Sequence, residues 1–133
     1  MKIAEKLFNL AENARKNAYS PYSKFKVGAA IYANNQEYYA SCNVENVSFP
    51  CGTCAEAGVI SEMIANGGSK ILEILIIADS NSLISPCGAC LQRIKEFSDE
   101  ETIIHLANHS GIQKSLKISD FLPLAFDEKE LRL

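Results

Sequence analysis

The chain lacks any hydrophobic run long enough to cross a membrane, which takes about 20 consecutive apolar residues. Its first segment, Met1-Lys-Ile-Ala-Glu-Lys-Leu7, interrupts the apolar positions with charges, so it also lacks the apolar core of a secretory signal peptide. Both absences argue against a membrane-inserted or exported protein. We therefore expect a cytoplasmic protein with no membrane partner.

Clusters of basic residues are missing too. The 133 residues carry a formal net charge of -3, with no run of Lys or Arg to match the phosphate backbone of a nucleic acid. Internal repeats and low-complexity linkers are absent, and the length suits one domain. With 47% hydrophobic and 22% charged residues, the composition is that of an ordinary globular core. We predict a single domain over residues 1–133 that does not bind nucleic acid.

The sequence does contain five cysteines, four of them in two Cys-x-x-Cys pairs: Cys51 with Cys54, and Cys87 with Cys90. In a reducing compartment, clustered pairs of this kind are typical of metal ligands or catalytic groups rather than of disulfides. The pattern therefore predicts a metal site.

The hydrophobic pattern predicts alternating helices and strands. Helices are expected at residues 2–18, at residues 55–65 and from Pro86 onward. Strands are expected at residues 26–33, 36–42, 71–78, 102–107 and, more weakly, 113–118. Asn34-Asn35 suits a hairpin turn between the first two strands, and the almost continuously apolar run 71–78 suits the buried middle of a sheet. This order predicts an α/β sandwich with a mixed sheet.

The spacing of the two cysteine pairs bears on the kind of metal site. Structural zinc modules separate two Cys-x-x-Cys units by about 15 to 20 residues. Here residues 55–86, 32 in all, separate Cys54 from Cys87 and contain a whole predicted helix and strand. Such a βαβ-like crossover brings two helix N-termini together, and their free N–H groups and dipoles stabilise thiolates.

Glu56 distinguishes two kinds of metal site: a catalytic site, which leaves one position of the metal open for water, and a closed structural site, in which four cysteines fill every position. A carboxylate two residues after Cys54, on the first turn of a helix, can relay protons beside a metal ion, whereas a structural site has no use for one. Zinc base deaminases pair His-x-Glu, or a three-cysteine variant, with Pro-Cys-x-x-Cys. Cys54-Ala-Glu56 and Pro86-Cys-Gly-Ala-Cys90 fit that variant. The pattern favours zinc on Cys54, Cys87 and Cys90 over a closed four-cysteine site that includes Cys51.

Further motifs make a resemblance specific. In chain order they are Ser20-Pro-Tyr-Ser23 with Phe25-Lys-Val-Gly-Ala-Ala30, Asn43-Val-Glu-Asn46, Cys54-Ala-Glu56, Ser85-Pro-Cys-Gly-Ala-Cys90 and Leu122-Pro-Leu-Ala-Phe126. With them the chain resembles the small homotetrameric cytidine deaminases over nearly its whole length. The resemblance implies a three-layer α/β/α sandwich with a mixed five-stranded sheet. It also implies hydrolysis of cytidine and deoxycytidine to uridine and deoxyuridine in pyrimidine salvage, with release of ammonia.

The resemblance also assigns residues to roles. It implies one Zn²⁺ per chain on Cys54, Cys87 and Cys90, with Glu56 as the catalytic acid and base that handles the protons of water. Substrate binding is implied for Phe25 on the pyrimidine, Asn43 and Glu45 on the ribose 3′ region, Ala55, and Phe126 in a neighbouring subunit's site. Active sites are then shared within a homotetramer. From the residues alone, Phe25 also suits a strand core, Phe126 a C-terminal anchor, and Asn43 with Glu45 a polar loop. His105 and His109 are expected to be structural or surface residues.

The chain departs from the family at two positions. Ala57 and Leu91 stand where arginines are usual, and Arg93, one turn into the helix after Cys87, is a possible substitute. Blasticidin S deaminases, a related branch, also lack the arginine after the glutamate. A deaminase of a modified cytosine nucleoside is therefore an alternative function, and a non-catalytic, zinc-stabilised oligomer is a third.

Overall fold

The computed structural model describes residues 2–131 and contains one five-stranded sheet. The strands are β1 (Val27–Ala33), β2 (Tyr38–Cys42), β3 (Ile71–Ala78), β4 (Ile103–Asn108) and β5 (Gly111–Leu116). The helices are α1 (Ile3–Lys16), α2 (Ala55–Ala65), α3 (Gly88–Glu96) and α4 (Ile118–Phe121), with 3₁₀ turns at Phe49–Cys51 and Glu128–Leu131. The strand order is β2-β1-β3-β4-β5, with β3 and β4 parallel and the other neighbours antiparallel. The prediction of an α/β fold with a mixed five-stranded sheet is confirmed.

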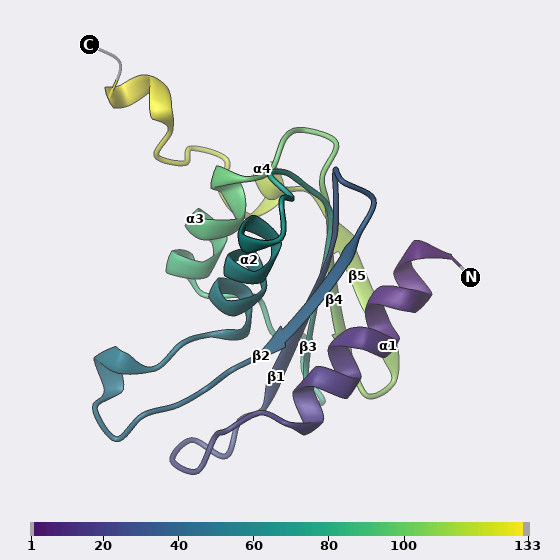
Figure 1. The fold of residues 1–133 in the computed structure, drawn as a ribbon, viewed down its shortest axis with the longest axis vertical. Coiled ribbons are helices and arrows are strands. Elements are labelled where there is room, and N and C mark those ends of the chain that lie inside the picture. The colour runs from purple at the N-terminus through teal and green to yellow at the C-terminus, as the bar shows by residue number, and fades with distance from the viewer. Residues whose placement is uncertain (1, 132–133) are drawn as a thin grey trace.

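Helices lie on both faces of the sheet, so the fold has three layers (Figure 1). α1 covers one face, and α2 and α3 cover the other. Between residues 2 and 131, no helix combines the length and the apolar character that a membrane crossing requires.

The central strand β3 is buried on both sides, as its apolar run predicted. Ile74 and Ile76 pack into the core under α2 and α3, whereas Leu75 and Ile77 pack under α1. Because successive side chains of a strand point to opposite faces, one strand serves both cores. The expected crossover between the cysteine motifs is the β2–α2–β3 unit, whose two strands are both antiparallel to β1 and therefore run in the same direction. The β3–α3–β4 unit is a second crossover between parallel strands, and it brings α3 beside α2.

A glycine allows α1 to lie close to β1. A Cβ atom placed on Gly28 would lie 2.1 Å from the carbonyl oxygen of Ala11, deep inside the contact distance of the two atoms. Leu7 and Ala11 on the same helix are fully buried. The apolar face of α1 can therefore pack directly against β1, because Gly28 has no side chain to hold the helix away from the strand.

Five local predictions were wrong in detail. β2 begins at Tyr38 instead of at residue 36, and β5 spans Gly111–Leu116 instead of residues 113–118. α1 ends at Lys16 instead of Ala18, and α3 begins at Gly88 because Cys87, rather than Pro86, occupies the N-cap. In the hairpin turn the positive φ falls on Gln36 (63°), not on Asn34 or Asn35. Asn34 is used differently, since its side-chain oxygen accepts hydrogen bonds from the N–H groups that precede β3.

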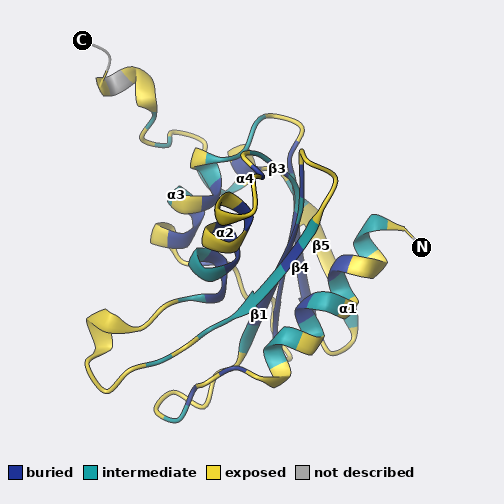
Figure 2. Ribbon diagram, viewed as in Figure 1, coloured by how far each residue is buried: buried dark blue, intermediate teal, exposed yellow. Residues whose placement is uncertain are grey.

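Two segments project from the core and are largely exposed (Figure 2). The loop between β2 and α2 exposes 77% of both Val47 and Phe49, and the C-terminal segment exposes 98% of Leu124 and 59% of Phe126. Large contiguous apolar patches mark contacts with other molecules, whereas single exposed apolar side chains are ordinary.

Candidate metal and catalytic site

Both helices that carry the cysteine motifs begin at a cysteine. Cys54 is the N-cap of α2, and its sulfur accepts a hydrogen bond from the N–H of Ala57 (3.4 Å). Cys87 is the N-cap of α3, and its sulfur accepts one from the N–H of Cys90 (3.5 Å). An N-cap acceptor satisfies a free helix N–H group, and the positive end of the helix dipole favours a thiolate there.

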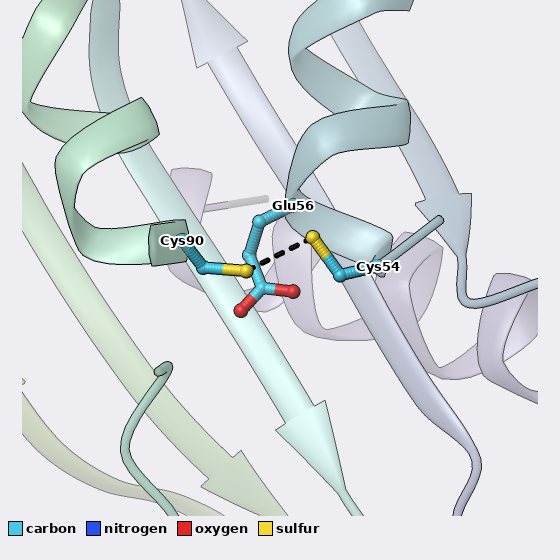
Figure 3. A group of neighbouring side chains, drawn as sticks. All are labelled: Cys54, Glu56 and Cys90. Atoms are coloured by element: carbon cyan, nitrogen blue, oxygen red, sulfur yellow. Dashed lines mark hydrogen bonds between the residues drawn. The ribbon is translucent and has the colours of Figure 1, made fainter. Parts of the chain in front are cut away.

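Two sulfurs and a carboxylate meet where these helices begin (Figure 3). The sulfurs of Cys54 and Cys90 are 2.9 Å apart, and Glu56 places a carboxylate oxygen within 4.8 Å of both. Cys87 does not belong to this closest group and is exposed, although its sulfur adjoins Cys90. Cys51 is also exposed, and its sulfur lies 3.5 Å from the hydroxyl of Ser48.

The donor chemistry of this group fits a zinc ion. The hydrogen bond from the Cys90 thiol lowers the pKa of Cys54, and the N–H of Ala57 acts in the same direction. The same bond, in which the Cys90 thiol donates its proton to the Cys54 sulfur, raises the pKa of Cys90. A metal ion can take the place of that proton, and tightly grouped thiolates select zinc among the common divalent ions.

Glu56 is held apart from water. Its residue is only 5% exposed, and burial raises the pKa of Glu56 to about 7, with a further contribution from the charge of Cys54. A carboxyl group of this kind can both accept and release a proton near neutral pH. These properties suit Glu56 better for acid-base chemistry than for the role of a fourth metal ligand.

A cavity of about 250 Å³ opens beside the group. It is lined by Val27, Asn43, Val44, Glu45, Gly52, Thr53, Cys54, Ala55 and Glu56. Five of the residues predicted for the site therefore share one cavity. Sequence reasoning missed the other four, Val27, Val44, Gly52 and Thr53, although Val27 and Val44 lie inside motifs that carried the resemblance.

Asn43 binds the backbone of the segment that precedes β1. Its side-chain oxygen accepts a hydrogen bond from the N–H of Val27 (2.9 Å), and its amide nitrogen donates to the carbonyl of Phe25 (2.8 Å). The Asn43 side chain thus spans the peptide groups on either side of Lys26. This clamp was not expected from the sequence.

Glu45 binds the same segment nearer its start. One carboxylate oxygen accepts the N–H groups of Tyr22 (3.0 Å) and Ser23 (3.1 Å), and the other accepts the hydroxyl of Ser23. The hydrogen bond from Ser23 lowers the pKa of Glu45. Asn43 and Glu45 therefore hold the segment 22–27, of which Val27 lines the cavity. Ser23 does not line the cavity but holds the Glu45 carboxylate, a role that only its place in the Ser20-Pro-Tyr-Ser23 motif could have indicated.

The two predicted aromatic contacts lie outside this cavity. Phe25 is 37% exposed and lines a neighbouring cavity of about 400 Å³ with Arg15 and Asp79. Phe126 lies in the projecting C-terminal segment, where its carbonyl accepts a hydrogen bond from the Gln92 side chain (3.0 Å). Their roles in substrate binding stay predictions.

The histidines take no part in the site. His105 is buried on the face that α1 covers, between the side chains of Glu73 (2.8 Å) and Ser115 (2.7 Å). His109 is largely exposed and lies 3.4 Å from Asp79.

Comparison with known proteins agrees with this geometry. Residues 1–106 match the family described as cytidine and deoxycytidylate deaminase zinc-binding region. A cytidine deaminase of Sporosarcina psychrophila is 36% identical over 127 residues, which cover 96% of this chain and 93% of that protein. The crystal structure of cytidine deaminase from Burkholderia pseudomallei superposes with a TM-score of 0.87 at 35% identity, covering 95% of this chain and 100% of that one. For the cytidine deaminase from Mycobacterium tuberculosis the TM-score is 0.80 at 32% identity, over 96% of this chain and 99% of that one. The chain belongs to the cytidine and deoxycytidylate deaminase family.

Proposed function

We propose that the protein hydrolyses cytidine and deoxycytidine to uridine and deoxyuridine, with release of ammonia, in the pyrimidine salvage of the cytoplasm. The observation that carries the proposal is the position of one buried carboxyl group: Glu56 lies beside the sulfurs of Cys54 and Cys90 and lines the same cavity as Asn43 and Glu45. The free cysteines suit a reducing compartment.

The residues that would hold the metal are Cys54, Cys87 and Cys90, with one Zn²⁺ per chain. Zinc bound by three sulfurs would supply Lewis acidity that makes water a usable nucleophile near neutral pH. The backbone N–H groups that already face Cys54 and Cys87 keep these thiolates in place. Glu56 would stay free of the metal for the proton chemistry.

Glu56 would carry the protons of the reaction. It takes a proton from the water that attacks C4 of the cytosine ring and passes it to ring N3. It then moves the second water proton to the departing amino group, which leaves as ammonia. A carboxyl group with its pKa near neutrality suits both directions of transfer within one turnover.

Asn43 and Glu45 would recognise the sugar. Both side chains border the cavity, and Glu45 accepts three hydrogen bonds out of about four that a carboxylate can accept. A ribose hydroxyl can therefore still donate to it. A free base would lack that contact, so a nucleoside is the better substrate.

The size of the cavity supports a shared active site. At about 250 Å³ it is smaller than the range of roughly 300 to 1,000 Å³ that is usual for small-molecule sites. The exposed Phe126 would complete it from a neighbouring copy in a homotetramer. Deleting the chain from Phe121 onward should then lower the activity, and light scattering should find a tetramer for the full chain. A fully active monomer would contradict this part of the proposal.

The activity is tested by following the ultraviolet band of cytidine after the zinc-loaded protein is added. Deoxycytidine, cytosine and blasticidin S are run in parallel, and we expect the band to fall with the two nucleosides but not with cytosine. Turnover of blasticidin S alone would replace the proposed substrate with the modified nucleoside. No change with any of the four would overturn the function.

The ligand set is tested by zinc content. Cys87→Ala should lose most of the metal, whereas Cys51→Ala should retain about one zinc per chain, because the Cys51 sulfur contacts Ser48 instead of the sulfur pair. Loss of zinc from Cys51→Ala would favour the closed four-cysteine site.

A further inference from the structure

Arg93 on α3 approaches both sulfurs of the site. Its Nη1 lies 3.8 Å from the sulfur of Cys90 and 4.0 Å from the sulfur of Cys54. Cys90 and Arg93 are one helical turn apart and so lie on the same face of α3. Cys54 belongs to the other helix, so one guanidinium reaches sulfurs from both halves of the site. Residues 2–131 offer these two sulfurs no contact with any other cationic side chain.

The charge of the site explains what such a group can do. Three thiolates and one Zn²⁺ carry a net charge of -1, and a guanidinium beside the sulfurs balances it. Hydrogen bonds from a cation withdraw electron density from the sulfurs and leave the metal a stronger Lewis acid. An arginine suits this task better than a lysine, because its planar fork offers several N–H donors from one side chain.

The remaining side chains of the first turns of α2 and α3 do not supply that charge. Ala57 offers the Cys54 sulfur only its backbone N–H. Leu91 is 6% exposed and belongs to the main hydrophobic core together with Ile94. Of the residues on α3 that follow Cys90, Arg93 is therefore the one whose side chain turns toward the metal-binding sulfurs.

We propose that Arg93 is a positioning residue of the metal centre, which donates hydrogen bonds to Cys54 and Cys90 and neutralises the excess charge of the zinc-thiolate group. It acts through the sulfurs and does not touch the substrate. The kinetic part of its test rests on the proposed deaminase function, whereas the spectroscopic part requires only metal binding.

The test replaces zinc with Co²⁺ and records the sulfur-to-cobalt charge-transfer band of Arg93→Gln. Without the guanidinium the sulfurs are richer in electrons, so the band should move to longer wavelength. Lys114→Gln removes one positive charge from an exposed position on β5 and should leave the band in place. Because Arg93 is exposed, its substitution should also leave the melting temperature near that of the parent.

A second variant separates charge from packing. Adding Ala57→Arg to Arg93→Gln places a guanidinium on the residue whose N–H already faces Cys54, and the band should return toward its original position. With the zinc protein, Arg93→Gln should lower kcat by roughly tenfold, the lower end for a residue that supports metal ligands, and change KM little.

The outcomes distinguish this inference from the proposed function. An Arg93→Gln band that overlays the parent's, or one that moves equally in Lys114→Gln, would overturn the role of Arg93 even if the protein deaminates cytidine. A shifted band in a protein that deaminates nothing would support Arg93 and overturn the function. A parent protein that binds no Co²⁺ would overturn both.

Discussion

Replacing Glu56 with Gln is the most direct test of the proposed chemistry. Glutamine has nearly the same shape and volume, and Glu56 is 5% exposed, so the variant should pack as the parent does. What changes is the ability to accept and release a proton. The sulfurs of Cys54 and Cys90 are untouched, so about one zinc per chain should remain.

The size of the effect follows from the position of Glu56. Within residues 2–131, Glu56 is the carboxylate that is grouped with the sulfurs of Cys54 and Cys90. Glu45 lines the same cavity, but its oxygens accept hydrogen bonds from Tyr22 and Ser23, and it is not part of that group. General acid-base catalysis contributes typically about 10² to 10⁴-fold in rate. At about 1.4 kcal/mol per tenfold, this corresponds to a barrier higher by about 3 to 5 kcal/mol.

The assay compares kcat for cytidine in the parent, Glu56→Gln and Glu62→Gln, with zinc measured on the same samples. Glu62 lies on the same helix but is exposed, so it controls for the loss of a carboxylate. A zinc-loaded Glu56→Gln protein that retains more than about a tenth of the parent's kcat would refute the proton-transfer role.

Three further predictions concern the framework of the site. Gly28→Ala should lower the free energy of unfolding by at least about 1 to 3 kcal/mol in urea titrations, because the new methyl group would collide with the Ala11 carbonyl; an unchanged midpoint would mean that α1 shifts freely. His105→Ala should cost about 1 to 3 kcal/mol by the same measurement, since it removes a buried imidazole and its hydrogen bonds to Glu73 on β3 and Ser115 on β5, and should leave kcat unchanged; a large loss of kcat would show that the α1 face takes part in catalysis. The hydrogen bond from Lys70 lowers the pKa of Asp99 below its ordinary value, so this pair stabilises the fold above that value and ceases to do so as the pH falls through the lowered pKa. Asp99→Asn should therefore reduce the difference in unfolding free energy between pH 7 and pH 3, and an identical difference in both proteins would contradict the linkage.

Local spacing was sufficient to predict the elements that carry the site. The apolar run of β3 predicted a central strand, and the positions of Cys54 and Cys87 predicted two cysteines at helix starts. These features depend on neighbours within a few residues, where the periods of helices and strands operate. The crossover between the two motifs then follows from the alternation of helix and strand.

Contacts between distant segments could not be predicted in the same way. The sequence motif treats Cys54, Cys87 and Cys90 alike, yet the structure pairs Cys54 with Cys90 and leaves Cys87 exposed. Asn43 was expected to face a ligand, and its side chain also holds the backbone of Phe25. Such contacts depend on how loops pack against each other, which spacing along the chain does not specify.

The contacts of Arg93 could be predicted from the sequence only in part. From the sequence it is one exposed cation on a helix, and the register of α3 places it on the face of Cys90. The sequence by itself determined that register, the fold class and the residue types of the site. Whether the guanidinium also reaches Cys54 depends on the distance and rotation between α2 and α3, which the hydrophobic core beneath Leu91 and Ile94 sets. Only the tertiary structure decides that, because helix packing results from many side chains far apart in the chain.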